Sequence, residues 1–128
     1  MKNIILFIWQ LPQNILGLLV ILFSKTWTYG FNIYWTEYNF GVSLGKYIIL
    51  NNKVNSLTIN HEKGHQKQSL YLGWLYLLII GLPSFIGNIW DRLLHKSWSI
   101  YKREKWYYSL PWEKSADKLG KVRRWGDL

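Results

Sequence analysis

The chain has 128 residues, which is the length of one domain. Its net charge is +9, from 16 basic and 7 acidic residues, and it contains no cysteine, which excludes disulfides and cysteine-based zinc sites. The basic charge suits nucleic acid or anionic lipid headgroups. We favour lipid and expect no nucleic-acid partner, because uncharged apolar runs accompany 9 Trp and 9 Tyr residues.

The first apolar run covers residues 4–23, carries no charge and is long enough to span a bilayer. We expect a membrane segment here rather than a cleaved signal peptide, because no small-residue cleavage site follows Phe23. Polar residues and a proline interrupt the run at Gln10, Pro12, Gln13 and Asn14. The interruption is typical of a kink, a helix-packing face or a re-entrant turn.

Residues 26–50 are rich in aromatic and β-branched residues, with glycines at the breaks. This pattern predicts a small antiparallel β-hairpin or sheet. A helix is predicted over residues 57–80, with Asn55 or Ser56 as its N-cap. The first half of this helix is polar and its second half is apolar.

The second apolar run covers residues 69–90 and is interrupted at residues 81–84, where Pro83 is expected to end or kink a helix. Basic and aromatic residues follow. A short helix is then predicted over residues 111–119, because Pro111 can begin it and Gly120 can end it.

The segment His61-Glu-Lys-Gly-His65 carries the strongest chemical signal in the chain. Histidines four residues apart lie on the same face of a helix, where two imidazoles can bind one zinc ion. Glu62 then lies beside the pair without being a ligand, and it can act as a general base toward a water activated by zinc. The alternative is a pair of polar histidines in a solvated helical turn.

A second motif, Glu113-x-x-Ala-Asp117-x-x-Gly, lies 48 residues after His65. Together the two motifs resemble those of the gluzincin metallopeptidases, and in particular the membrane-bound CAAX prenyl protease and HtpX-like group. The resemblance implies that Glu113 is the third zinc ligand and that Asp117 orients His61. A carboxylate on the distal ring nitrogen of a histidine has that effect. The alternative is an exposed acidic stretch of helix.

The resemblance also implies that an extended substrate adds to the edge of a strand before the zinc helix. Residues 45–50 occupy that relative place in the chain. The alternative, equally weighted, is an ordinary core strand.

A shared metal ion restricts the membrane topology. His61, His65 and Glu113 must lie on one side of the bilayer, so residues 69–90 are expected to enter the membrane and return, turning at residues 81–84. The basic residues after this run favour a cytoplasmic active site.

His95 is expected to be an interfacial side chain rather than a ligand. Asp91 is expected to pair with Arg92 or Lys96. Gln68 is expected to be a polar neighbour of the zinc site, with a role in shaping the cleft as the alternative.

The sequence therefore predicts an α+β fold, a mainly helical, membrane-associated minimal gluzincin with a small β-sheet before the zinc helix. The expected function is that of a Zn²⁺-dependent endopeptidase whose peptide or protein substrate is associated with an anionic lipid membrane. One alternative is a non-catalytic adaptor or immunity-type membrane protein that retains the metal site. Another is a pore-forming or lipid-binding cationic protein.

Overall fold

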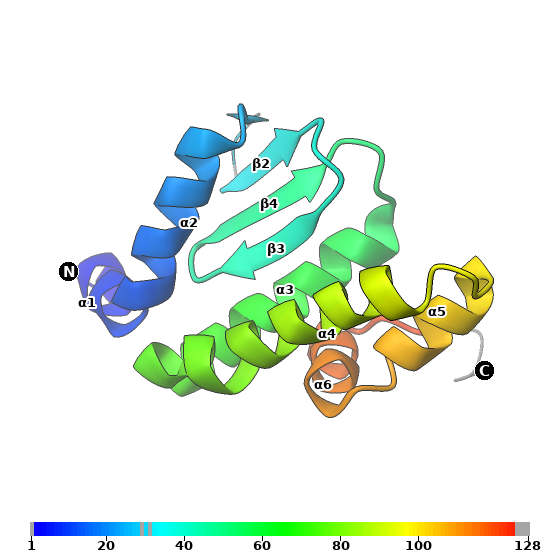
Figure 1. The fold of residues 1–128 in the computed structure, drawn as a ribbon. Helices are drawn as coiled ribbons and strands as arrows, with labels where there is room; N and C mark the ends of the chain where they lie inside the picture. The colour runs from blue at the N-terminus through cyan, green and yellow to red at the C-terminus, as the bar shows by residue number, and fades with distance from the viewer. Residues whose placement is uncertain (1, 29, 31, 125–128) are drawn as a thin grey trace.

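A computed structural model describes residues 2–28, 30 and 32–124 of the chain. It confirms an α+β architecture in which helices surround one small four-stranded sheet (Figure 1).

The N-terminal apolar run forms two helices, α1 (Lys2–Trp9) and α2 (Leu11–Phe23), which are bent by 85° at the break between them. The interrupting polar side chains are buried and hold this unit to the rest of the molecule. Gln13 Nε2 donates to Ser69 Oγ at 2.8 Å and to the Gly73 carbonyl at 2.8 Å, and the Lys46 amide donates to Asn14 Oδ1 at 2.7 Å. The interruption is thus both a kink and a packing face.

The sheet consists of β1 (Trp27–Thr28), β2 (Ile33–Thr36), β3 (Gly41–Leu44) and β4 (Tyr47–Asn51), in the order β1-β2-β4-β3. The β3–β4 and β1–β2 pairs are antiparallel, whereas β2 and β4 are parallel. The sheet is therefore mixed, and the antiparallel prediction is wrong for its central pair. Tyr29 and Phe31 of the predicted hairpin lie outside the described residues.

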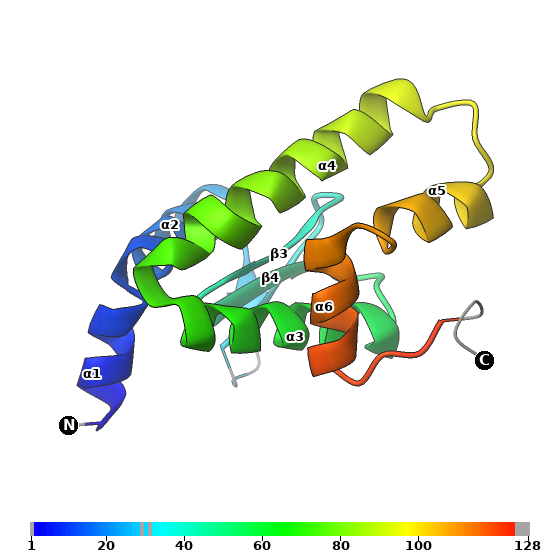
Figure 2. The same ribbon diagram turned by 90° about the horizontal axis from the view of Figure 1, so that it is seen from below.

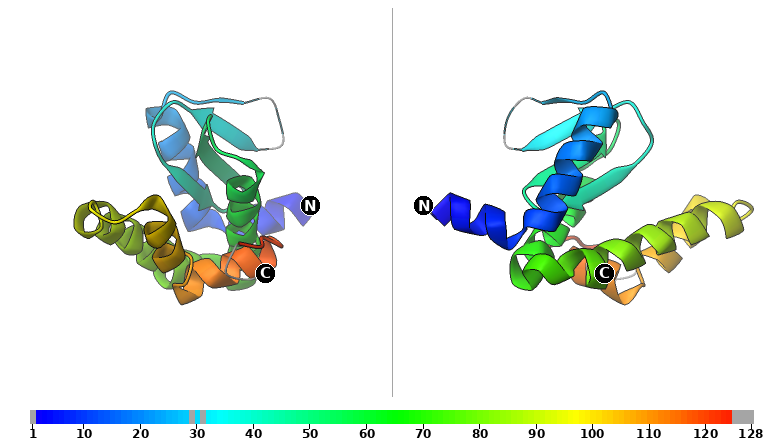
Figure 3. Two further views of the ribbon diagram at one scale, coloured as in Figure 1. Left: turned by 90° about the vertical axis from the view of Figure 1, so that its right-hand side faces the viewer. Right: turned by 60° about the vertical axis from the view of Figure 1, so that its left-hand side comes forward.

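Strand β4 is the central strand and supplies the core, because Ile48, Ile49 and Leu50 are at most 1% exposed. Helix α2 covers one face of the sheet, and α3 (Ser56–Leu72) covers the other (Figure 3). Consecutive apolar residues are typical of a strand that is buried on both faces. Of the two alternatives for residues 45–50, the core strand is therefore the one that the structure shows, and the edge strand beside it is β3.

Helix α3 begins where the sequence indicates, since Asn55 Oδ1 accepts from the Thr58 amide at 3.2 Å. It ends at Leu72, eight residues before the predicted end at residue 80, with Gly73 as its C-cap. The backbone of Gly73 has φ +55°, and the ring of Trp9 occupies the space that a side chain would need there. The chain then turns back through a short 3₁₀ segment, η1 (Gly73–Leu75).

From Leu77 to Leu94 the chain is one continuous helix. Among the described residues, it is the only single helix that is long and apolar enough to cross a membrane. The bent α1–α2 pair would be long and apolar enough only if its two helices formed one span. It comprises a π-helical turn, η2 (Leu77–Gly81), followed by α4 (Leu82–Leu94). Pro83 lies in the first turn of α4 after this wide turn, where its missing N–H is tolerated. The reversal predicted at residues 81–84 therefore lies at residues 73–75 instead.

Helices α5 (Ile100–Tyr107) and α6 (Pro111–Leu119) complete the fold. Asp91 of α4 pairs with Arg103 of α5 at 2.8 Å and with His95 at 3.0 Å, rather than with Arg92 or Lys96. His95 is buried and stacks on Trp98, so the interfacial placement predicted for it is wrong. Helix α6 packs against both α3 and α4, in the space where these two helices diverge (Figure 2).

Candidate metal centre

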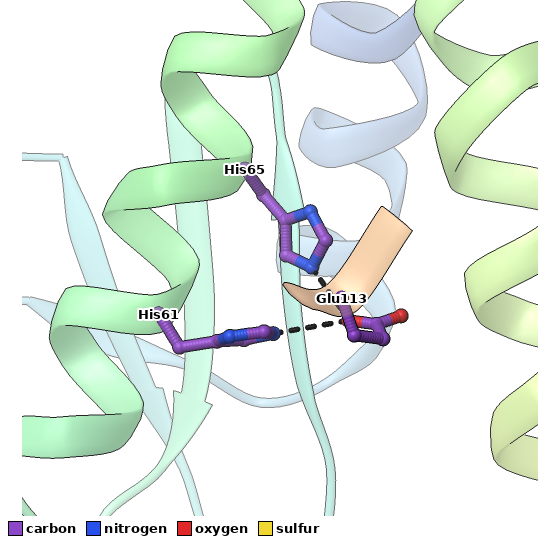
Figure 4. Close-up of side chains that lie close together, drawn as sticks. All are labelled: His61, His65 and Glu113. Atoms are coloured by element: carbon purple, nitrogen blue, oxygen red, sulfur yellow. Dashed lines mark hydrogen bonds and ion pairs between the residues drawn. The ribbon is translucent and has the colours of Figure 1, made fainter. Parts of the chain in front are cut away.

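Two helices that are distant in sequence bring the predicted ligands together. Helix α3 presents His61 and His65 one turn apart, with ring centroids 4.7 Å from each other. Helix α6 crosses α3 at Gly64, whose missing side chain leaves room for the backbone of Ala116. This close approach places Glu113 opposite the two imidazoles (Figure 4).

One carboxylate oxygen faces both histidines. Glu113 Oε1 lies 3.0 Å from His61 Nε2 and 2.9 Å from His65 Nε2. The three residues are between 0% and 4% exposed, and one ligand atom from each lies within 4.8 Å of the others. The structure thus contains a buried His-His-Glu group that can hold a metal ion.

The outer nitrogens of both rings are engaged by acceptors. His61 Nδ1 lies 2.7 Å from Asp117 Oδ1, and His65 Nδ1 lies 2.6 Å from Gln68 Oε1. The Gln68 amide donates to the Trp112 carbonyl at 3.0 Å, which fixes its oxygen toward His65. In a metal-bound site both Nδ1 atoms would carry the ring proton, so both Nε2 atoms would offer lone pairs beside the Glu113 carboxylate. Three such donors suit a cation between them.

Protons take that role when no metal is bound. Burial lowers the pKa of His61, but hydrogen bonds with Asp117 and Glu113 outweigh burial and raise this pKa to about 9. Burial raises the pKa of Glu113, but hydrogen bonds from His61 and His65 outweigh it and bring the pKa well below its usual value. These hydrogen bonds therefore favour a protonated imidazole beside an ionised Glu113.

The donor set fits a divalent metal. Glu113 Oε2 is buried and makes no hydrogen bond to any described residue, although Ser84 is near enough to help lower the Glu113 pKa. Two imidazoles and a carboxylate with one position open are the ligands of many catalytic zinc sites. Imidazole also suits iron, copper and nickel, so the donors alone do not fix the identity of the metal.

Glu62 lies beside the ligands at the floor of a cleft of about 790 Å³, which His65 also lines. Its Oε2 atom is buried and has no hydrogen-bond partner in residues 2–28, 30 and 32–124. Burial raises the pKa of Glu62, and the charges of His65 and His61 oppose this rise without cancelling it. A carboxylate in this state is suited to accept a proton.

The cleft has one wall from the free edge of the sheet and another from the apolar helices. Strand β3 lies near Glu62 at Gly41, where an added Cβ would lie 3.8 Å from Glu62 Oε1. The Tyr76 hydroxyl donates to the Ser43 carbonyl at 2.9 Å, and Tyr107 lines the cleft from α5. The edge of β3 and the candidate base thus face the same space.

Sequence analysis missed two residues that support the ligands. Gln68, expected only to be a polar neighbour or to shape the cleft, holds His65, and its place three residues after His65 on the same helix could have revealed this. Arg124 donates to Asp117 Oδ2 from Nε at 2.7 Å, and its guanidinium lies 3.4 Å from the centre of the Tyr108 ring. Nothing in the local sequence around Arg124 indicates that contact.

Comparison with protein-family models, with curated proteins and with solved structures gives no match. The molecule has an α+β fold with a buried His-His-Glu group that can hold a metal ion.

Proposed function

We propose that this chain is a metal-dependent endopeptidase of the gluzincin type, with zinc as its metal and a membrane-associated peptide or protein as its substrate. His61, His65 and Glu113 hold the metal in this proposal. Asp117 and Gln68 orient the two histidines, and Glu62 is the general base.

The observation that carries the proposal is the state of Glu62. A structural metal site needs ligands and their supporting partners, but it does not need a further buried carboxylate. Glu62 makes no hydrogen bond to a described residue, and it lines the cleft beside the ligands. Keeping such a group buried and unpaired costs folding free energy, which favours a role in catalysis.

The chemistry requires one proton relay. Held by His61, His65 and Glu113, a zinc ion would supply Lewis-acid chemistry toward the substrate carbonyl and would lower the pKa of water at the site to ~7. Glu62 accepts the proton that this water loses as its oxygen bonds to the carbonyl carbon. Glu62 then gives the proton to the amide nitrogen as the C–N bond breaks, and the products are a carboxylate and an amine.

Membrane association belongs to the same proposal. The continuous helix Leu77–Leu94 is long and apolar enough to cross a bilayer, which is weak support by itself. The net charge of +9 adds attraction to anionic lipids. The exposed basic residues after α4 favour the cytoplasmic leaflet by the positive-inside rule.

The test is metal content followed by peptide cleavage, with the protein purified in detergent. We expect one zinc per chain in the wild type and in Glu62→Gln, and none in His61→Ala. Cleavage of an unstructured protein substrate, followed by mass spectrometry, should be lost in Glu62→Gln. Glu37→Gln is the matched control, because it makes the same chemical change at an exposed position and should leave cleavage intact.

Two results would contradict the proposal. A wild-type protein without metal would remove the site. The other result is that both wild type and Glu62→Gln bind metal and do not differ in cleavage, whether both cleave or neither does. That result would favour the non-catalytic adaptor or immunity-type role.

A further inference from the structure

The continuous helix formed by η2 and α4 carries an uncovered apolar stripe along its length. Its members recur at three- and four-residue spacing and are each at least 41% exposed: Leu78, Leu82, Phe85, Ile86, Ile89 and Leu93. The flank of this stripe carries the polar side chains Ser84, Asn88 and Arg92, which line the cleft together with Phe85 and Ile89. A helix with one apolar face and one polar face is typical of segments that lie in a membrane interface.

Helix α2 extends this surface. Leu18, Leu19 and Leu22 are between 45% and 71% exposed on the side of α2 away from the sheet. Figure 2 shows α2 and α4 along one side of the molecule, with α6 and the segment that follows it along the other. We call the exposed apolar side chains of α2 and α4 the apolar face.

The residues that border the apolar face point to lipid as its occupant. Trp90 and Tyr101 are about half exposed at the far end of α4, where aromatic side chains suit the headgroup layer. Lys96, Lys102 and Lys105 are exposed nearby, and they complement anionic headgroups. A protein partner would not require aromatic and cationic residues to gather at the border in this way.

The packing of the neighbouring helices argues against a crossing by α4. Helix α5 packs against α4 and is joined to it by the Arg103–Asp91 pair at 2.8 Å. Helix α6 packs against the middle of α4, where Ser84 lies near Glu113. If α4 stood upright in the bilayer, these charged groups would lie at hydrocarbon depth, where they are costly. If α4 lies flat, they all remain on the aqueous side.

We propose that α4 and α2 lie in the plane of a single leaflet, with the apolar face in contact with lipid and the cleft opening into that leaflet. The cleft opens onto this face because Leu16, Phe85 and Ile89 line the cleft and are also 40% to 63% exposed. If the proposed peptidase function holds, the substrate segment reaches Glu62 from within the lipid and must itself be apolar. The placement in the leaflet does not depend on catalysis.

The placement can be measured with single cysteines, because the natural chain has none. Ile79, Ile86 and Leu93 are spaced by seven residues, so they share one line on the helix, with ~21 Å from first to last. Each is replaced in turn by Cys, labelled with an environment-sensitive fluorophore, and reconstituted into vesicles of equal parts phosphatidylcholine and phosphatidylglycerol. Lipids with quenchers at defined acyl-chain depths then report the depth of each position.

The flat placement predicts similar shallow depths at all three positions. Ser115→Cys, which is exposed on α6, is the control and should be quenched only from the water. A crossing helix would instead give the greatest depth at Ile86, with Ile79 and Leu93 reached from opposite sides of the vesicle. That result would overturn the proposal, and so would crosslinking between copies without any quenching by lipid. Neither metal binding nor cleavage enters the measurement, so its failure is separate from failure of the proposed function.

Discussion

Gly64 lies at the point where α3 and α6 touch, and its replacement by alanine tests the construction of the metal centre. An added Cβ would overlap the carbonyl oxygen of Ala116 and lie 2.7 Å from its carbonyl carbon. Carbon atoms in contact are normally separated by about 3.7 Å, so the two helices must move apart by ~1 Å or more. Metal–ligand distances tolerate only ~0.2 Å, so Glu113 would leave the reach of an ion held by His61 and His65. We expect metal affinity to fall by more than ~100-fold, beyond the usual effect of losing one supporting partner.

The fold itself should survive this substitution. Overpacking costs about 1–3 kcal/mol, whereas alanine is favoured over glycine within a helix by ~1 kcal/mol. Metal affinity is measured by competition with a chelating dye, and circular dichroism checks the helix content. Gly87→Ala is the matched control, because its Cβ would meet only the flexible end of Leu110, at 3.1 Å. If Gly64→Ala bound metal as tightly as Gly87→Ala, the reasoning from helix contact to ligand geometry would be refuted.

Three further outcomes are expected. Asp117→Asn should weaken metal binding about 10- to 100-fold, because His61 loses the carboxylate that fixes its tautomer; an unchanged affinity in dye competition would contradict this role. Metal uptake should release protons, because the raised pKa keeps His61 protonated in the metal-free site at neutral pH. The apparent metal affinity should therefore rise as the pH is raised from neutral toward about 9. Calorimetry in two buffers of different ionisation enthalpy measures the proton release, and a binding heat that is the same in both buffers would exclude it. Ser69→Ala should lower the free energy of unfolding by about 1–3 kcal/mol, because its buried hydroxyl bonds both Gln13 and Gln10; chemical denaturation measures this, with the exposed Ser115→Ala expected to be neutral.

The local part of the metal centre follows from sequence spacing. His61 and His65 are four residues apart, as are Glu113 and Asp117, so each pair must lie on one face once its segment is helical. The helix over residues 111–119 also has clear local signals in Pro111 and Gly120. What spacing cannot supply is the crossing of α3 and α6, which depends on Gly64 meeting the backbone of Ala116.

The fold departs from the predictions where contacts between distant residues decide. Gly73 ends α3 because the ring of Trp9 fills the space beside it, and no local pattern reports that contact. Pro83, the strongest local signal for a break, is accommodated by a π-helical turn. The parallel pairing of β2 with β4 joins strands separated by β3, and strand composition does not specify partners.

The link between the N-terminal helices and the end of α3 bears on the order of folding. Trp9 Nε1 donates to the Leu70 carbonyl at 2.7 Å, and Gln13 donates to the Gly73 carbonyl at 2.8 Å. Carbonyls at the end of a helix have no partners within it, so α1 and α2 supply caps that α3 lacks. These caps are synthesised about 60 residues before the carbonyls that they satisfy. The nascent chain must therefore keep α1 and α2 available until α3 has been synthesised.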